Sequence, residues 1–152
     1  MPVTGGAAVI GAAICQALAR HGAQVYFGDL DGARCAEVAD RIRDAGGQAR
    51  ALPGDLVAPG TGQALVDALR AEGSGLDVLV TAAIWIRYAP LTEIDEADAN
   101  RMITVGLLAN LRLLQAAVGL LAQRGGSVVN VTSSVAVRPP PASSSTRRSR
   151  AR

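Results

Sequence analysis

Residues 4–11 read Thr-Gly-Gly-Ala-Ala-Val-Ile-Gly and lead directly into a helical pattern. A strand-like run at 24–28 follows and ends on Asp29, eighteen residues after Gly11. Glycines let the backbone approach a pyrophosphate closely, and the helix N-terminus supplies free N–H groups and a favourable dipole. The spacing to Asp29 is near the ~20 residues expected for a carboxylate that binds a ribose 2′-hydroxyl. This order of turn, helix, strand and acid predicts the front of a dinucleotide-binding βαβ unit.

Strand and helix patterns alternate along the rest of the chain. We expect strands at 2–4, 24–29, 48–52, 76–80 and 127–131, helices at 10–21, 32–45 and 61–72, and a helical segment at 93–124 with a break near Asp98. Repeated β-then-α units predict an α/β fold, a Rossmann-like doubly wound parallel sheet in the order 3-2-1-4-5, incomplete at both ends. Residues 1–141 are expected to form this partial domain.

The composition is that of a globular protein. The chain has 152 residues, of which 49% are hydrophobic and 3% aromatic, so the core has to be aliphatic. No apolar run approaches the ~18 residues of a membrane-spanning helix, and no signal peptide opens the chain, so we expect a cytoplasmic protein without a membrane partner. Cys15 and Cys35 fall in predicted helices and are expected to be reduced, semi-buried thiols. We expect no metal site.

Residues 142–152 differ from the rest in charge. They carry four arginines and no acid, so the net charge of +2 becomes −2 when they are left out. The periodicity ends at the Arg-Pro-Pro-Pro run at 138–141, and we expect a disordered Arg- and Ser-rich tail. Such a tail suggests nucleic-acid binding as a hypothesis, but it has no interleaved aromatics, and we expect no nucleic-acid partner.

Several segments resemble motifs of the short-chain dehydrogenase/reductase family, over residues 2–141. The glycine turn, Asp29, the Asp-Leu pair at 55–56 and the Asn-Val-Thr-Ser run at 130–133 carry the resemblance. It implies an NAD(P)-binding domain that serves hydride transfer on small-molecule alcohols or ketones. It assigns the catalytic serine to Ser133, with Ser134 as the near alternative. The cofactor-binding residues that it implies are Thr4, Gly5, Gly6, Ile10, Gly11, Asp29, Leu30, Asp55, Leu56 and Ala83.

The sequence departs from the family pattern at chemically important positions. Val9 stands at the middle glycine of the turn, where it is expected to crowd the pyrophosphate and to resist unusual dihedrals. Residues 81–84 read Thr-Ala-Ala-Ile in place of Asn-Asn-Ala-Gly, and Gly106 aligns with the supporting Asn, four residues before Asn110. The Tyr-x-x-x-Lys pair is absent, because no tyrosine follows the fifth strand and the chain has no lysine. A tyrosine needs such a cation to lower its pKa for acid–base work.

These observations support two hypotheses from different classes. The first is an NAD-preferring oxidoreductase, inactive as this truncated chain, in which Asp29 accepts from ribose hydroxyls and repels a 2′-phosphate while Val9 keeps binding weak. The second is a non-catalytic nucleotide-binding or interaction module on the same half-fold. Simpler interpretations stay open: Asp29 as a helix-capping acid, Asp55 as a loop acid, and Trp85 and Tyr88 as loop aromatics that cover a core rather than line a substrate cleft.

The long helical segment carries an apolar face that the expected fold leaves without a partner. Strand 127–131 would be an exposed edge as well. We therefore expect self-association through the helix at 98–123. The residues of this face are Ile103, Leu107, Leu111, Leu114, Val118 and Leu121.

The tail also suggests a shift of reading frame. Residues 142–148, Ala-Ser-Ser-Ser-Thr-Arg-Arg, have a composition that GC-rich DNA gives in a wrong frame. A Ser145 codon that ends in T, with the first two bases of any Thr146 codon, spells TAC for tyrosine. That tyrosine would fall thirteen residues after Ser133, a spacing common in the family. The hypothesis is a frameshifted gene whose intact form is a complete dehydrogenase.

Overall fold

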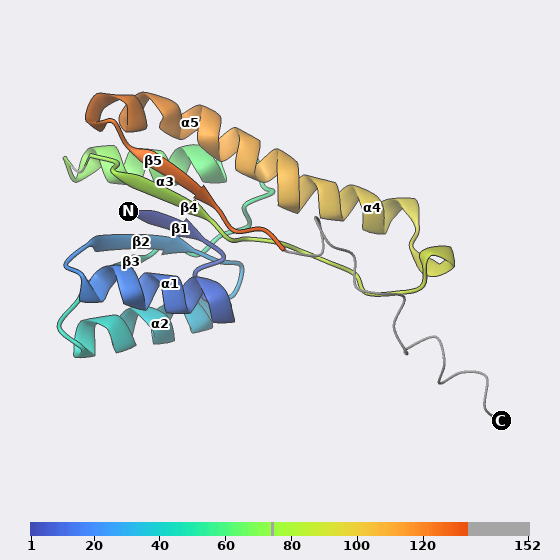
Figure 1. Cartoon of the computed structure of the whole chain (residues 1–152), viewed down its shortest axis with the longest axis horizontal. Helices are drawn as coiled ribbons and strands as arrows, with labels where there is room; N and C mark the ends of the chain where they lie inside the picture. The colour runs from blue at the N-terminus through green and yellow to red at the C-terminus, as the bar shows by residue number, and fades with distance from the viewer. Residues whose placement is uncertain (74, 134–152) are drawn as a thin grey trace.

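The computed structural model describes residues 1–73 and 75–133, so Ser134 and the tail at 142–152 lie outside the described residues. Within them, five parallel strands form one sheet in the order β3-β2-β1-β4-β5, which confirms the predicted fold class and strand order (Figure 1). The strands are β1 (Pro2–Thr4), β2 (Gln24–Gly28), β3 (Gln48–Ala51), β4 (Val78–Thr81) and β5 (Ser127–Asn130). The helices are α1 (Val9–Arg20), α2 (Gly32–Asp44), α3 (Thr61–Ala71), α4 (Glu96–Ile103) and α5 (Ala109–Arg124), with a 3-10 turn η1 (Leu91–Glu93) and a π-turn η2 (Thr104–Leu108).

Successive residues of a strand face opposite sides of the sheet, as the pleat requires. Val25 and Phe27 of β2 pack in the core with α1 and α2, whereas Tyr26 between them packs in the core with α3 and α5. Figure 1 shows these two pairs of helices on opposite faces of the sheet. The sheet is therefore the buried middle layer of three, and its strand ends are left to form a site.

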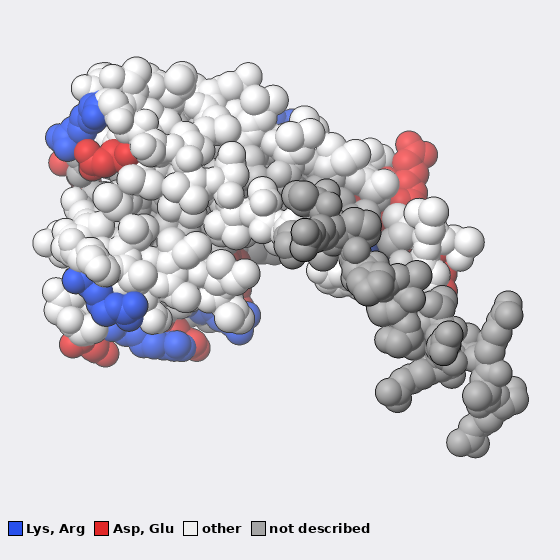
Figure 2. Space-filling view, viewed as in Figure 1, with Lys and Arg blue, Asp and Glu red and all other residues white. Residues whose placement is uncertain are grey.

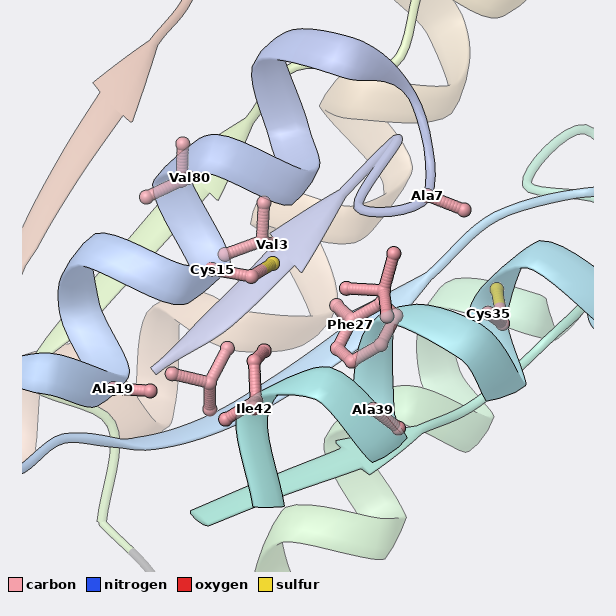
Figure 3. Packing of buried hydrophobic residues seen from close by; sticks show 11 residues of the cluster. Val3, Ala7, Cys15, Ala19, Phe27, Cys35, Ala39, Ile42 and Val80 are labelled. Carbon is pink, nitrogen blue, oxygen red and sulfur yellow. The ribbon is translucent and has the colours of Figure 1, made fainter. Parts of the chain in front are cut away.

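The core under α1 and α2 is built from small and aliphatic side chains around Phe27 (Figure 3). Cys15 and Cys35 belong to this core; both thiols are free and fully buried, deeper than the semi-buried position expected. Burial raises the pKa of the Cys15 thiol to about 12 and also raises the pKa of Cys35. Because a thiol held neutral is a poor nucleophile, these two cysteines act as core residues.

The second core lies between the sheet and the pair α3 and α5. Leu76 and Leu79 pack there with Leu113 of α5, and all three are fully buried. Gly62 of α3 brings the two helices together, since a Cβ at this position would lie 3.3 Å from the Cα of Leu113. The close contact between α3 and α5 holds α5 in place, and with it the preceding helix α4.

One continuous helix runs from Glu96 to Arg124 through α4, η2 and α5. The predicted break near Asp98 is wrong, because the helix begins at Glu96. The Asp95 carboxylate caps it by accepting a hydrogen bond from the main-chain N–H of Asp98 at 2.8 Å. The irregularity lies further along, at the π-turn η2.

By length and composition alone this helix could cross a membrane, since its 29 residues include an 18-residue window of mean hydropathy 1.7. This is weak evidence, because the core helix of a globular protein passes the same test. Here Leu113, Ala117 and Leu120 are buried in the second core. Other residues of the helix, such as Leu107 and Val118, are exposed.

The apolar face expected to drive association is only partly exposed. Leu121 is buried and Leu114 is partly buried in the second core. We call the exposed remainder the apolar stripe; it consists of Ile103, Leu107, Leu111 and Val118, which are between 47% and 61% exposed. In Figure 2 the middle of the molecule is uncharged, and the arginines lie beside acidic residues near its rim. The described residues on that face therefore form no continuous basic patch.

Candidate functional site

A cleft of about 780 Å³ opens at the carboxyl ends of the strands, where ligands bind in open α/β sheets. Its walls come from the turn between β1 and α1, the ends of β2 and β3, the start of α3, the loop after β4, and α4. Most of the predicted cofactor-binding residues meet there. They are Thr4, Gly5, Asp29, Leu30, Asp55, Leu56 and Ala83.

Two glycines give the turn after β1 its shape. Gly5 has a φ of +68°, a conformation that favours glycine, and a Cβ there would lie 2.9 Å from the Ala83 backbone. A Cβ on Gly11 would lie 2.0 Å from the carbonyl oxygen of Gly5. Only glycine therefore lets α1 begin so close to the turn.

The first turn of α1 leaves main-chain donors for a ligand. The N–H groups of residues 6–8 donate to protein acceptors. Within the described residues, the N–H groups of residues 9–11 donate to no protein acceptor. Donors of this kind, together with the dipole of the helix, form an anion-binding site suited to phosphate.

Thr4 ties the glycine turn to the loop after β4. Its buried Oγ1 accepts hydrogen bonds from the main-chain N–H groups of Ala82 and Ala83, both at 3.2 Å. On the neighbouring strands, the hydroxyl of Thr81 donates to Oδ1 of Asn130 at 2.6 Å. Side chains thus link β1 to β4, and β4 to β5, at the edge of the cleft.

Asp29 lies between the glycine turn and α2. Its Oδ2 accepts a hydrogen bond from the N–H of Ala7 at 3.1 Å, and its Oδ1 accepts one from the N–H of Leu30 at 2.8 Å. The helix-capping interpretation of Asp29 is wrong, because Asp31 caps α2 by accepting from the N–H of Arg34 at 3.0 Å. Oδ1 also accepts a longer hydrogen bond from the N–H of Asp31 at 3.5 Å, whereas Oδ2 keeps a further lone pair, so the group can still accept from a ligand.

Asp55 and Leu56 form the wall at the end of β3. The Oδ1 of Asp55 accepts a hydrogen bond from the N–H of Val57 at 2.9 Å, so this residue both shapes its loop and lines the cleft. Leu30, 67% exposed at the end of β2, adds a second apolar side chain beside it. Apolar walls next to polar groups suit a flat heterocycle attached to a sugar.

Four predicted site residues do not line the cleft. Gly6 and Gly11 are buried behind the turn, where a side chain would collide with neighbouring atoms. Ile10 is 61% exposed on α1. Ser133 is exposed, three residues beyond the end of β5.

Two departures from the family pattern have local structural outcomes. Val9 is the first residue of α1 and takes helical dihedrals, so the expected backbone strain does not arise, but its side chain is 84% exposed at the helix start. Gly106 lies in the π-turn with open space around it, since a Cβ there would meet nothing within 4 Å. Asn110 donates from Nδ2 to the carbonyl oxygen of Gly106 at 2.9 Å, while its Oδ1 is buried without a partner among the described residues.

The wall formed by α4 was missed in the sequence. Arg101 lies with its guanidinium over the ring of Trp85, 4.8 Å from the centroid, and both residues line the cleft. Trp85 is thus a cleft residue, whereas Tyr88 is 89% exposed and lies outside the lining. The available signal was the spacing of four between residues 100 and 104 and between residues 101 and 105, which places each pair on one face of a helix. The α4 and η2 residues of this wall are Asn100, Arg101, Thr104 and Val105.

The residues present fit a dinucleotide. The absence of a Cβ at Gly5 and Gly11 lets the turn pack directly against Ala83 and against the start of α1, where residues 9–11 keep their main-chain donors. Asp29 can accept from ribose hydroxyls, and Leu30 with Leu56 can flank a base. The described residues contain no group of three or more side chains suited to hold a metal ion.

Comparison with known proteins gives consistent relatives. The chain matches the family described as short chain dehydrogenase over residues 1–145. It is 40% identical over 134 residues to cis-4-hydroxycyclohexanecarboxylate dehydrogenase of Sinomonas cyclohexanicum, covering 86% of this chain and 53% of that protein. It is 34% identical over 136 residues to D-threitol dehydrogenase of Mycolicibacterium smegmatis, covering 88% of this chain and 52% of that protein. The chain therefore spans about half the length of the curated relatives it matches.

Solved structures with the same fold include proteins crystallised with a nucleotide. A 3-oxoacyl (acyl-carrier-protein) reductase from Agrobacterium tumefaciens C58 with NADP bound has a TM-score of 0.83 and 33% identity, over 91% of this chain and 54% of that one. A metagenomic short-chain oxidoreductase in complex with NADP has a TM-score of 0.78 and 33% identity, over 87% and 61% of the two chains.

Proposed function

Because the chain belongs to the short-chain dehydrogenase/reductase family, we propose that its cleft binds the adenosine part of the cofactor in an NAD(P)-dependent oxidoreductase acting on small-molecule alcohols or ketones. The cofactor, when bound, would supply or accept the hydride. The observation that carries the proposal is one cleft lined both by the glycine turn, through Thr4, Gly5 and Ala8, and by Asp29, whose carboxylate accepts from the Ala7 N–H of that turn. The residues of this chain would bind the cofactor and orient it.

We propose that this cleft prefers NAD to NADP. The carboxylate of Asp29 can accept hydrogen bonds from both ribose hydroxyls, whereas a 2′-phosphate would place like charges together. Its fixed position supports this assignment, because the N–H groups of Ala7 and Leu30 hold both oxygens. The exposed Val9 side chain at the start of α1 is expected to weaken binding by either cofactor.

We assign the catalytic serine to Ser133, where it would hydrogen-bond the substrate oxygen. An acid–base partner is missing from this chain, since the sequence has no lysine and its tyrosines both precede β5. Gly106 adds no side chain at the position of the family's supporting Asn. We therefore expect this chain alone to bind a dinucleotide weakly and to transfer no hydride.

Two measurements test this proposal. Calorimetric titration with NAD and NADP should give measurable binding with the lower Kd for NAD; tighter binding of NADP would overturn the cofactor assignment. Incubation with NAD and secondary alcohols, or with NADH and ketones, should give no change in absorbance at the wavelength of the reduced cofactor. Turnover by rigorously purified protein would refute the expected inactivity.

A second candidate function is a non-catalytic nucleotide-binding or interaction module. The observation that favours it is the missing acid–base pair, because the sequence has no lysine and both tyrosines precede β5. Self-association in sedimentation velocity with no binding of NAD in calorimetry would favour an interaction module over a cofactor-binding domain.

We also propose that a second copy of the chain covers the apolar stripe on the helix at 98–123. Two identical stripes that pair about a two-fold axis would bury both at once. The two buried free thiols, Cys15 and Cys35, support our proposal of a reducing, cytoplasmic compartment. We propose no role for nucleic acid or membrane.

A further inference from the structure

We propose that Arg101 and Trp85 form an anion-binding subsite of the cleft, which takes a carboxylate or phosphate group of the ligand. The inference rests on the proposed function, because it assigns the charge of a group that the same cleft binds. Arg101 comes from α4 and Trp85 from the loop after β4, so the subsite joins two walls of the cleft.

Arg101 is the basic residue of this cleft. Among the described residues that line it, Asp29 and Asp55 are acidic and only Arg101 is basic. Its guanidinium lies over the indole of Trp85, 4.8 Å from the ring centroid. Stacking on a ring restrains the side chain while leaving the N–H groups at the edge of the guanidinium free to donate.

A neighbouring ion pair explains why Arg101 is not neutralised. Asp98 lies three residues before Arg101 on α4, a spacing at which an acid and an arginine commonly pair. Instead, Nε of Arg87 is 2.9 Å from Oδ2 of Asp98, whose side chain is only 16% exposed. Within the described residues the guanidinium of Arg101 donates to no acceptor, and its contact is with Trp85.

The chemistry of this pair selects oxyanions. A planar guanidinium presents two parallel N–H donors that match a carboxylate or a phosphate, and it stays charged at every physiological pH. The apolar side chains of Ile84 and Val105 line the same cleft. The anionic group could belong to a substrate carboxylate or to a phosphate of the cofactor.

Trp85 provides a direct test, because it is the single tryptophan of the chain. Its fluorescence would be followed while the full chain is titrated with inorganic phosphate, cyclohexanecarboxylate, NAD and NADP, with calorimetry as the second readout. The variant is Arg101→Gln. The matched control is Arg112→Gln, which removes the same charge from an exposed position on the continuing helix outside this cleft.

We expect Arg101→Gln to weaken binding of at least one anionic probe about tenfold or more, the effect of losing one charge-assisted hydrogen bond. Arg112→Gln should leave every Kd unchanged, and Arg101→Lys should recover only part of the loss. A loss confined to NADP identifies a cofactor phosphate as the source. A loss confined to cyclohexanecarboxylate identifies the substrate.

The two proposals fail in different ways. Equal binding of every probe to the unsubstituted chain, Arg101→Gln and Arg112→Gln overturns the subsite but leaves dinucleotide binding intact. Absence of any response to NAD and NADP overturns the proposed function, while binding of phosphate or cyclohexanecarboxylate that depends on Arg101 still supports the subsite. Melting curves of each variant show that the comparison is made on folded protein.

Discussion

The carboxylate of Asp29 accepts a hydrogen bond from the main-chain N–H of Ala7 across 22 positions of sequence, at 3.1 Å. This contact joins the end of β2 to the turn between β1 and α1. The acid that would bind ribose is thus also a structural brace of the turn that would bind pyrophosphate. Loss of this one side chain should change both the stability of the fold and the affinity of the site.

Replacement of Asp29 and of its neighbour Asp31 by Ala should show that the two carboxylates have different roles. Asp29→Ala leaves the N–H of Ala7 without its acceptor and should lower the free energy of unfolding by about 1–3 kcal/mol. Asp31→Ala removes a helix cap and should lower it by about 1 kcal/mol. Only Asp29→Ala should raise the Kd for NAD and reduce the preference for NAD over NADP. Chemical denaturation and calorimetry measure the two effects, and a Kd for NAD that responds equally to both variants would contradict the assignment.

Replacement of Gly11 by Ala should show how tightly α1 is packed on the turn. The added methyl would lie 2.0 Å from the carbonyl oxygen of Gly5, so α1 has to move, and we expect a loss of about 1–3 kcal/mol in the free energy of unfolding. Gly119→Ala is the control, because that glycine lies inside α5 with nothing within 4 Å of a new Cβ. It should stabilise the protein by about 0.5–1 kcal/mol. Equal effects of the two substitutions would disprove the close contact.

Stability should fall in alkaline solution because of the buried thiols. Burial raises the pKa of Cys15 from its ordinary value of 9.0 to about 12, so the folded state holds a proton that the unfolded state releases. The stabilisation is complete below pH 9 and is lost as the pH rises toward 12, with a slope of up to about 1.4 kcal/mol per pH unit for one thiol. The free energy of unfolding, measured by denaturation between pH 7 and 11, should therefore depend less on pH in Cys15→Ala than in the unsubstituted chain. Parallel pH profiles for the two proteins would contradict this cause.

Association should depend on the apolar stripe. Leu107 is 61% exposed on this stripe, and replacement by Glu should shift the chain toward monomer in sedimentation velocity. Ala36→Glu is the control, because it adds the same charge to an exposed position of α2 on the opposite layer. An unsubstituted chain that is already monomeric at tens of micromolar, with a sharp cooperative melt, would refute self-association.

The strand order followed from the sequence because its determinants are local. Alternation of strand and helix patterns allows few topologies once the handedness of β-α-β connections is applied. The helix at 93–124 was predicted less well. A break near Asp98 is predicted from the sequence, but the Asp95 cap and the acidic first turn favour a helix start there instead. Sequence periodicity also gives no sign of the π-turn at Thr104–Leu108.

The candidate site was predictable where one motif supplies a whole wall. Gly5, Asp29 and Asp55 follow strand ends, and strand ends of a parallel sheet converge. Arg101 and Trp85 were not predicted as a pair, because their contact joins a loop to a helix and depends on the competing ion pair between Arg87 and Asp98. Such a contact requires the distances between elements, which the sequence pattern does not contain.

The π-turn at Thr104–Leu108 has a consequence for the rotational phase of the long helix. Every fourth residue of an α-helix advances by about 40° around the axis, so the row 101, 105, 109, 113 would wind through about 120°. The residue that a π-turn inserts reverses about 100° of this winding. Arg101 and Val105 therefore face the cleft on the same flank by which Leu113 enters the core. Deletion of one residue here would leave α5 packed but rotate Arg101 and Val105 away from the cleft. The rotational phase of this one helix therefore determines whether the core and the cleft wall can form together.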